Sequence, residues 1–387
     1  MWRDFSLSSV SAGFVAVLVG FTSSAVIVFQ AAEAAGASPA EVSSWIGALC
    51  IGMGVTSIGL SLYFRAPMLT AWSTPGAALL ATSLSGVPMA EVIGAFVVCA
   101  MLITACGISG WFEKAMDRIP QAIAAAMLAG VLLRFGMDVF VAMKTEFTLV
   151  LAMFVTYLIL KRVSPRYVIV IVLAVGVVLA WFKGLIQVDQ LGIAVTELVF
   201  TMPAFSWSSV VGIALPLFVV TMASQNVPGV AVIRAAGYKT PISPLISWTG
   251  GATLLLAPFG GYALNLAAIT AAICMGKEAH EDSSKRYTAA VSAGFFYLLL
   301  GVFGATIATL FAAFPKELVL AVAGLALLST IGSSLATAVK DASNREAALI
   351  TFLITASGVT LFGIGAAFWG LVGGVCAMFA LSPRNKF

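Results

Sequence analysis

Long apolar stretches separated by short polar connections run along the whole chain. A transmembrane helix needs about 20 apolar residues to cross a hydrocarbon layer of roughly 30 Å. This criterion predicts fourteen segments in two sets of seven. The first set covers 8–32, 41–63, 67–84, 88–109, 119–136, 146–161 and 166–183, and the second covers 207–235, 243–257, 258–276, 286–313, 316–338, 345–362 and 364–381.

The composition agrees with this pattern. The 387 residues are 61% hydrophobic and 9% charged, and the mean hydropathy is +1.08, whereas a soluble domain carries roughly 25% charged residues. We therefore expect an all-α polytopic membrane protein in a lipid bilayer. The first apolar run, from Val10, exceeds the roughly 7–15 residues of a signal-peptide core, so we interpret it as the first span.

Charge and cysteine content exclude several classes of protein. The net charge of +4 gives no indication of a nucleic-acid partner. The five cysteines are scattered through apolar segments without a C-x-x-C pair, so we expect neither a disulfide framework nor a metal site. The sequence also gives no indication of a cofactor.

The distribution of Lys and Arg predicts the orientation. With the N-terminus in the cytoplasm and fourteen alternating spans, sixteen of the 20 basic residues fall in inside loops, and the four outside are Arg134, Lys144, Lys183 and Lys316. Short cytoplasmic loops carry an excess of positive charge. We therefore expect both termini in the cytoplasm.

The two sets of seven segments also resemble each other. The run SSWIG (43–47) opens the second segment and ISWTG (246–250) opens the ninth, while IPQAIAAAMLAG (119–130) and FPKELVLAVAG (314–324) open the fifth and the twelfth. Units with an odd number of spans face opposite ways across a membrane. This predicts inverted repeats at 1–190 and 200–387, an architecture of many secondary transporters.

The third and tenth segments are broken. Pro67 and Pro75 interrupt the third, and a proline fits best in the first turn of a helix. Ser73 or Thr74 then caps a short helix over 75–84, and 67–73 is extended. In the tenth segment, Pro258, Gly260 and Gly261 disfavour helix, and Asn265 is the expected cap of the helix that follows.

Extended backbone at membrane depth needs protein partners or a cavity, because lipid cannot satisfy its polar groups. Two extended pieces can pair near the midplane and direct two helix N-termini, from Thr74 and Asn265, at one cavity. Exposed N–H groups there favour an anion. The alternative is a proline kink that packs against neighbouring helices.

The eighth segment adds two amides, Gln225 and Asn226, and the equivalent first segment has Ser23 and Ser24. Amides inside a membrane are unfavourable unless they are paired. Either these groups line the cavity or they bond between helices only to hold the bundle.

Four runs make the prediction more specific: LVGFTSSAVIVFQAA, TAWSTPGAALL, NLAAITAAICMGKEAH and GIGAAFWGLVGG. They resemble the BenE family of benzoate:proton symporters over essentially the whole chain. The resemblance implies repeats that interleave into core and gate domains, with substrate between the third and tenth spans. It implies import of benzoate or a similar aromatic carboxylate with protons by alternating access, in a bacterial-type inner membrane. A homodimer is compatible with it.

The resemblance carries over Thr74, Gln225 and Asn265 as substrate-binding residues. Tyr262 stands where the family frequently has His, which puts a proton-transfer role of that position in question. For an aromatic ring, the candidate neighbours are Phe21, Phe29, Phe259 and Tyr262. The full set of predicted substrate-binding residues is Ser23, Ser24, Ser73, Thr74, Gly76, Gln225, Asn226, Tyr262 and Asn265.

Other functions are less consistent with the sequence. The only histidine, His280, falls in a loop, so a Ser-His-Asp arrangement inside the membrane is excluded, and we expect no enzyme. An anion channel would show a ring of like charge, and the sequence shows none. Transport of another small organic anion or of a nucleobase is the nearest alternative. Nucleobase binders of this fold typically carry intramembrane acids, which are missing beside Gln225 and Asn265.

Overall fold

The computed structural model describes residues 4–110, 112, 121–163, 168–187, 194–277, 279–359, 361 and 366–381. Nearly all of its regular elements are helices. In chain order the elements are α1 (Leu7–Ala34), α2 (Pro39–Phe64), β1 (Thr70–Trp72), α3 (Thr74–Ser83), α4 (Met89–Ile108), α6 (Gln121–Ala142), α7 (Phe147–Val163), α8 (Val168–Phe182), α9 (Trp207–Ser209), η3 (Val210–Ala214), α10 (Leu215–Thr221), η4 (Met222–Asn226), α11 (Val227–Ala235), α12 (Ile242–Leu256), η5 (Ala257–Phe259), β2 (Leu264–Leu266), α13 (Ile269–Met275), η6 (Ser283–Lys285), α14 (Tyr287–Val302), α15 (Gly304–Ala312), α16 (Lys316–Val339), α17 (Arg345–Ala356) and α18 (Ala366–Leu381).

Many of these helices suit a bilayer. Within the described residues, six helical stretches are long and apolar enough to cross a membrane, and two bent pairs bring the number to eight. The six stretches are Pro39–Phe64, Met89–Ile108, Gln121–Ala142, Trp207–Arg234, Ile242–Phe259 and Lys316–Val339. The protein is therefore a multi-pass membrane protein. The full set of fourteen crossings stays a prediction.

The segment predicted as one span over 286–313 is two helices. The axes of Ser283–Val302 and Gly304–Ala312 meet at 66°. At the bend, the Thr196 hydroxyl accepts a hydrogen bond from the Ala305 N–H at 3.2 Å. A side chain from a distant segment thus satisfies a backbone donor that the bend frees, and the sequence of the span itself does not reveal this partner.

Small residues let several helices approach each other closely. A Cβ atom placed on Gly54 of α2 would lie 2.8 Å from the Gly294 carbonyl oxygen of α14. Between α4 and α12, a Cβ on Gly250 would lie 2.7 Å from the Thr104 backbone nitrogen. Close backbone approach replaces the hydrophobic driving force that is absent between helices in lipid.

The stretch from α9 to α11 is one helix that widens twice. The π-helical turns η3 and η4 end two residues before Pro216 and Pro228, respectively. A proline removes one backbone donor and crowds the preceding turn, and a wider turn accommodates it. The second π turn contains both predicted amides, Gln225 and Asn226.

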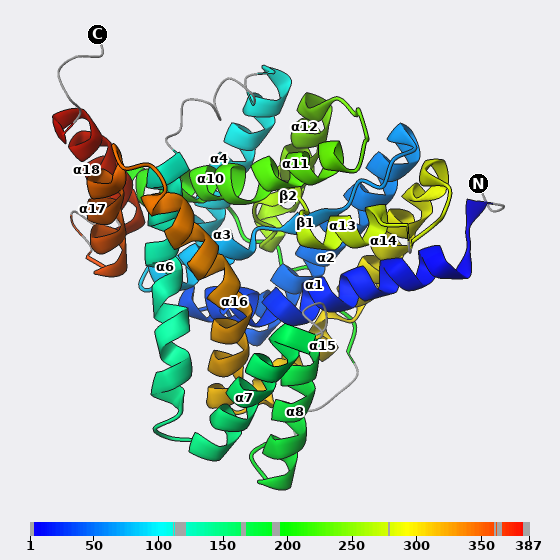
Figure 1. The fold of residues 1–387 in the computed structure, drawn as a ribbon, viewed down its shortest axis with the longest axis horizontal. Helices are drawn as coiled ribbons and strands as arrows, with labels where there is room; N and C mark the ends of the chain where they lie inside the picture. Colours follow the sequence, from blue (N-terminus) through cyan, green and yellow to red (C-terminus); the bar gives the residue numbers. More distant parts are fainter. Residues whose placement is uncertain are drawn as a thin grey trace.

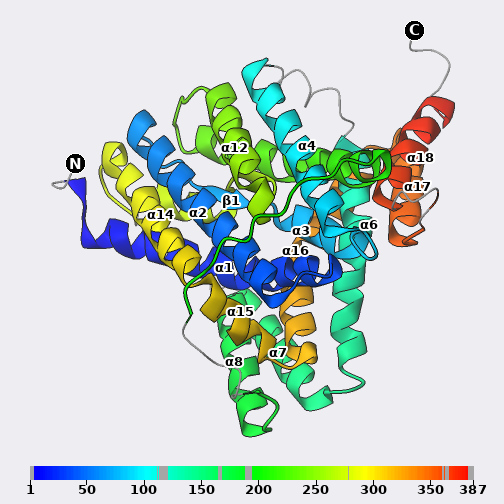
Figure 2. The same ribbon diagram turned by 180° about the vertical axis from the view of Figure 1, so that it is seen from behind.

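β1 and β2 lie near the middle of the molecule and are surrounded by helices (Figure 1). Seen from both sides, α7 and α8 form one end of the molecule, and α17 and α18 lie together along one side (Figure 2). α6 and α16 pack along each other between these groups and the two strands.

Candidate functional site

The two strands pair with each other where the third and tenth predicted segments break. They are antiparallel, with Thr70 opposite Leu266, Ala71 opposite Asn265 and Trp72 opposite Leu264. A two-stranded sheet leaves N–H groups unpaired along its outer edges, which lipid cannot satisfy. Side chains of neighbouring helices accept all four of these bonds: Ser57 Oγ from Thr70 N–H at 3.0 Å, Met53 Sδ from Trp72 N–H at 3.2 Å, Thr253 Oγ1 from Leu264 N–H at 3.0 Å and Asn226 Oδ1 from Leu266 N–H at 3.0 Å.

α3 begins immediately after β1. Ser73 is its cap: the Ser73 hydroxyl oxygen accepts the Gly76 N–H at 3.1 Å and the Thr221 hydroxyl at 2.9 Å. The Ser73 carbonyl oxygen accepts the Ala77 N–H at 2.7 Å. Pro75 has no N–H to satisfy. Most backbone N–H groups of the first turn therefore already have a partner within the protein. Thr74 is the first-turn residue that is left to interact with a ligand.

α13 begins differently from the prediction. Its first residue is Ile269, and its cap position is Ala268, which makes no side-chain capping bond. Asn265 lies inside β2 and does not cap the helix, because its side-chain amide donates instead to the Ala263 carbonyl at 3.0 Å. The prediction that a helix begins at Asn265 is wrong.

A cavity of about 330 Å³ lies beside this strand pair, and we call it the central cavity. The two broken segments line it together with α1, α2, the η4–α11 turn, α14 and α16. Its lining includes Gly20, Ser24, Met53, Trp72, Thr74, Pro75, Ser224, Gln225, Pro228, Ile269, Thr270, Tyr297, Leu327, Thr330 and Ser333. Ligand sites in proteins typically measure roughly 300–1,000 Å³.

Polar groups with spare hydrogen-bonding capacity face the central cavity. Within the described residues, the side chains of Thr74, Gln225 and Thr270 line it and make no hydrogen bond to the protein. Each can both donate and accept a hydrogen bond. Thr270 is buried, whereas Thr74 and Gln225 are half-buried, and all three side chains are available to a ligand or to water in the cavity.

The rest of the lining is apolar and aromatic. The Trp72 indole N–H donates to Ser24 Oγ at 2.9 Å, and its ring meets Phe21 edge-to-face with centroids 5.5 Å apart. Ser24 in turn donates to the Gly20 carbonyl at 2.8 Å. These contacts fix the Trp72 ring as one wall. None of the described lining residues carries a formal charge at neutral pH.

Sequence comparison identifies the family of this chain. The model of the BenE family, described as benzoate membrane transport protein, matches residues 3–380. The chain belongs to the BenE family. Inner membrane protein YdcO of Escherichia coli is 49% identical over 379 residues, which are 97% of each chain. The benzoate membrane transport protein of Acinetobacter baylyi is 44% identical over 379 residues, 98% of this chain and 96% of that one.

BenE proteins are transporters, so this chain is a membrane transporter rather than an enzyme. Solved structures share its fold at low sequence identity. The transmembrane domain of a cyanobacterial bicarbonate transporter, BicA, has a TM-score of 0.60 at 11% identity, over 97% of this chain and 98% of that domain. SLC26A9 has a TM-score of 0.65 at 10% identity, over 98% of this chain and 66% of that one.

Three of the predicted residues of this BenE chain line the central cavity: Ser24, Thr74 and Gln225. The side chain of Ser23 lies outside the described part of the structure. Ser73 and Gly76 lie behind Thr74, where Ser73 caps α3 and a Cβ on Gly76 would come within 2.7 Å of Leu217 Cδ1.

The other three predicted residues lie outside the lining of the central cavity. Asn226 is fully buried and holds β2 through the Leu266 N–H. Asn265 and Tyr262 are also fully buried, and within the described residues Asn265 Oδ1 and the Tyr262 hydroxyl have no hydrogen-bond partner. The Tyr262 ring packs against Trp45 and Phe96, with centroids 6.2 Å and 5.5 Å apart.

Two of the four aromatic candidates lie away from the central cavity. Phe29 stacks on Phe311 and Phe259 packs against Phe200, and neither lines the central cavity. The structure adds Trp72, Thr270 and Tyr297, which the sequence analysis missed. The first two lie inside motifs that the analysis had singled out, so the breaks themselves were the available signal. Nothing in the α14 sequence points to Tyr297.

Proposed function

We propose that this protein imports benzoate or a similar aromatic carboxylate together with protons, by alternating access, and binds it in the central cavity. The observation that carries the proposal is a cavity that combines an aromatic wall, Trp72, with the unbonded polar side chains of Thr74, Gln225 and Thr270. Membership of a family described as benzoate membrane transport proteins supports this substrate class.

We assign the carboxylate to the Thr74 end of the central cavity. The positive end of the α3 dipole lies there, and an uncharged protein site can hold an anion through such a helix end together with hydroxyl donors. The ring then lies against Trp72 and Leu327. Ser24 acts by orienting Trp72, and Ser73 and Gly76 act by holding the start of α3. Asn226 and Asn265 support the strands. Ser23 stays a candidate from sequence.

We further propose that 1–190 and 200–387 are inverted seven-span repeats that interleave into core and gate domains. Helix contacts support this because they exchange under the repeat: α2 packs on α14 as α12 packs on α4, and α7 packs on α8 as α17 packs on α18. The pairing of β1 with β2 belongs to the same symmetry. We also propose fourteen crossings of an inner membrane, with both termini in the cytoplasm as the basic-residue distribution predicts.

The test is calorimetric binding of benzoate to the purified protein and its Thr74 variants. A hydrogen bond to a charged group contributes about 1.5–3 kcal/mol, so Thr74→Ala should raise the dissociation constant roughly tenfold to a hundredfold. Thr74→Ser keeps the hydroxyl and should stay within a few-fold of wild type. Thr74→Asp should bind worst, because it adds a negative charge beside the carboxylate. Wild-type affinity in Thr74→Asp would remove the site from the α3 end.

Uptake into proteoliposomes tests the substrate and the proton. Labelled benzoate should accumulate faster with an inward proton gradient than without one. Unlabelled benzoate should compete far better than uracil or sulfate. Equal competition by uracil would favour the nucleobase alternative, and an uptake rate independent of the gradient would rule out proton symport.

A further inference from the structure

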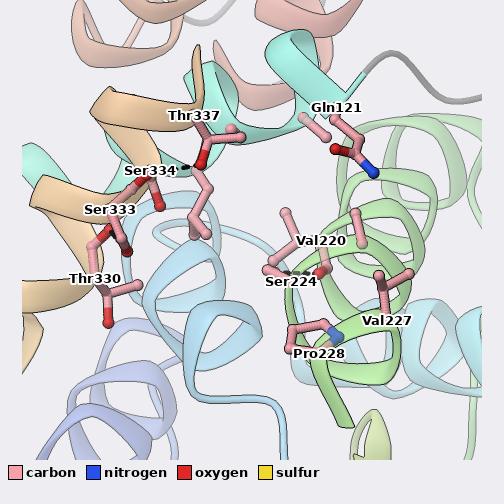
Figure 3. Close-up of a pocket in the computed structure, with 13 residues that line it drawn as sticks. Gln121, Val220, Ser224, Val227, Pro228, Thr330, Ser333, Ser334 and Thr337 are labelled. Carbon is pink, nitrogen blue, oxygen red and sulfur yellow. Dashed lines mark hydrogen bonds between the residues drawn. The ribbon is translucent and has the colours of Figure 1, made fainter. Parts of the chain in front are cut away.

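A second cavity of about 400 Å³ lies between α6, α16 and the η4–α11 turn, and we call it the α6–α16 cavity. Figure 3 shows Thr330, Ser333, Ser334 and Thr337 along the face of α16 that looks across the cavity, with Gln121 and Ser224 on the other side. The four α16 residues are spaced i, i+3, i+4 and i+7, which places them on one helix face.

The α6–α16 cavity continues the central cavity. Ser224, Pro228, Thr330 and Ser333 line both. From Thr330 to Thr337 the helix rises by about 10 Å, at ~1.5 Å per residue. A molecule that leaves the central cavity past Thr330 thus meets a hydroxyl group on each successive turn of α16.

Two of the four α16 hydroxyls, those of Thr330 and Ser334, are free to donate to a ligand. Ser334 is 6% exposed and lines the α6–α16 cavity, and its hydroxyl makes no hydrogen bond to any described residue. Ser333 and Thr337 are exposed, and each uses its proton on a backbone carbonyl of its own helix, at 3.1 Å and 2.9 Å. Every described residue lining the α6–α16 cavity is uncharged, so a fixed charge is not available to trap a carboxylate.

The helix ends beside the α6–α16 cavity indicate to which side of the membrane it opens. Gln121 is the first residue of α6, and Thr337 lies three residues before Lys340, where α16 has ended. Both ends belong to connections that the basic-residue distribution assigns to the cytoplasm. A third pocket, of about 590 Å³, lies at the end of α1, the start of α2 and along α15, and its lining includes Thr309. The predicted topology assigns these ends to the side of the membrane away from the cytoplasm.

We propose that the α6–α16 cavity is the passage between the central cavity and the cytoplasm, and that the hydroxyl face of α16 conducts the substrate carboxylate through it. This rests on the proposed function for the identity of the substrate. The hydroxyl protons of Thr330 and Ser334, which no described residue accepts, replace water around the carboxylate, and the missing counter-ion lets it leave. The passage therefore governs the rate of transport, whereas the central cavity governs affinity.

A charge placed in the passage separates these two roles. Thr337 is exposed, so Thr337→Asp and its uncharged control Thr337→Asn should both fold. A carboxylate that passes Ser334, one helical turn from position 337, meets this charge at close range, whereas Thr330 at the central cavity is about 10 Å from position 337 along the helix. We expect the maximal benzoate uptake rate of Thr337→Asp to fall about tenfold below that of Thr337→Asn, with calorimetric affinities within twofold. Equal uptake rates would overturn the proposal.

Thiol labelling tests the passage without relying on benzoate. Cys106 and Cys376 are the described cysteines that are not buried, and both are replaced by Ala in the background variant. Ser333→Cys should react with a membrane-impermeant thiol reagent in inside-out vesicles, and Thr309→Cys in right-side-out vesicles. A Ser333→Cys that reacts only from the right-side-out face, or from neither face, would contradict the proposed passage.

Benzoate in the labelling reaction then distinguishes the two proposals. If both hold, saturating benzoate slows the modification of Ser333→Cys several-fold and leaves Thr309→Cys unchanged. The other outcome is that Ser333→Cys reacts in inside-out vesicles, but benzoate does not bind to the protein and does not slow the reaction. The passage then stands and the substrate assignment fails.

Discussion

The two broken segments occupy equivalent places in the fold but are stabilised in different ways. In β1–α3, Ser73 caps a helix of 10 residues from within the segment, and the backbone adopts ordinary conformations. β2–α13 leads into a helix of 7 residues without a side-chain cap. Gly260 and Ala263 lie in the left-handed region, with φ of 89° and 41°.

Of the two segments, only the β2 region contains fully buried polar atoms without a hydrogen-bond partner in the described structure. Tyr262 Oη and Asn265 Oδ1 belong to the β2 region, whereas no such atom is found among the described residues of β1–α3. A non-glycine residue with positive φ persists only where its surroundings enforce it. Both strands depend on side chains of other helices, but the start of α3 is specified by its own residues, whereas the strained turn before β2 is held by distant partners such as Asn226 and Trp45.

The largest effect is expected when one glycine is replaced in each of the two broken segments. A Cβ on Gly260 would lie 1.8 Å from Trp45 Cδ1, and φ is 89°. Left-handed backbone disfavours a residue with a Cβ by about 1–2 kcal/mol, and overpacking adds about 1–3 kcal/mol. Gly260→Ala should thus lose at least about 2 kcal/mol of stability, measured by thermal unfolding in detergent.

Gly76→Ala is the matched variant in β1–α3. Its backbone has no positive φ, and its Cβ would meet the Leu217 side chain at 2.7 Å and the side chain of Ser73. The Leu217 side chain can shift and alanine favours the helix by about 1 kcal/mol over glycine, which offsets part of the crowding against Ser73, so we expect a loss of about 1 kcal/mol. A Gly76→Ala protein that unfolds at a lower temperature than Gly260→Ala would reverse the comparison.

A smaller effect is expected at Tyr262. Its hydroxyl is buried without a partner in the described structure, and such a group costs about 1–3 kcal/mol. Tyr262→Phe removes only that oxygen, so the variant should be more stable by about 1 kcal/mol. Thermal unfolding with parallel benzoate uptake makes the result informative: a stabilised variant with normal uptake assigns Tyr262 to packing. A destabilised variant would show that the hydroxyl has a partner.

The sequence predicted the first broken segment well because its signals are local. Ser73 and Pro75 both favour a helix start at this point, and the structure has α3 beginning at Thr74. The signals in the second segment were ambiguous. Asn265 is a good capping residue in general, but its amide bonds to the Ala263 carbonyl, and no short-range pattern indicates that choice.

The central cavity could be predicted only in part for a related reason. Thr74 and Gln225 stand out as polar groups in apolar segments, but α16 contributes Leu327 and Thr330 through the way α6 and α16 pack together. After its first two residues, the first half of α16, which contains Leu327, is apolar on all sides and does not reveal which face meets the cavity. The bend between α14 and α15 was missed because its partner, Thr196, lies far away in sequence.

The smallest predicted effect concerns Ala263. Changing this residue to glycine removes the strain of a left-handed alanine, about 1–2 kcal/mol, and adds flexibility to the unfolded chain, which opposes folding by about 0.4–1 kcal/mol. The two terms nearly cancel, so Ala263→Gly should equal or slightly exceed wild type in thermal stability. Ala78→Gly in α3 is the control. Ala78 is fully buried in a helix, where glycine costs about 1 kcal/mol. If both variants lost stability equally, Ala263 would carry no strain, and the contrast between β1–α3 and β2–α13 would reduce to their capping alone.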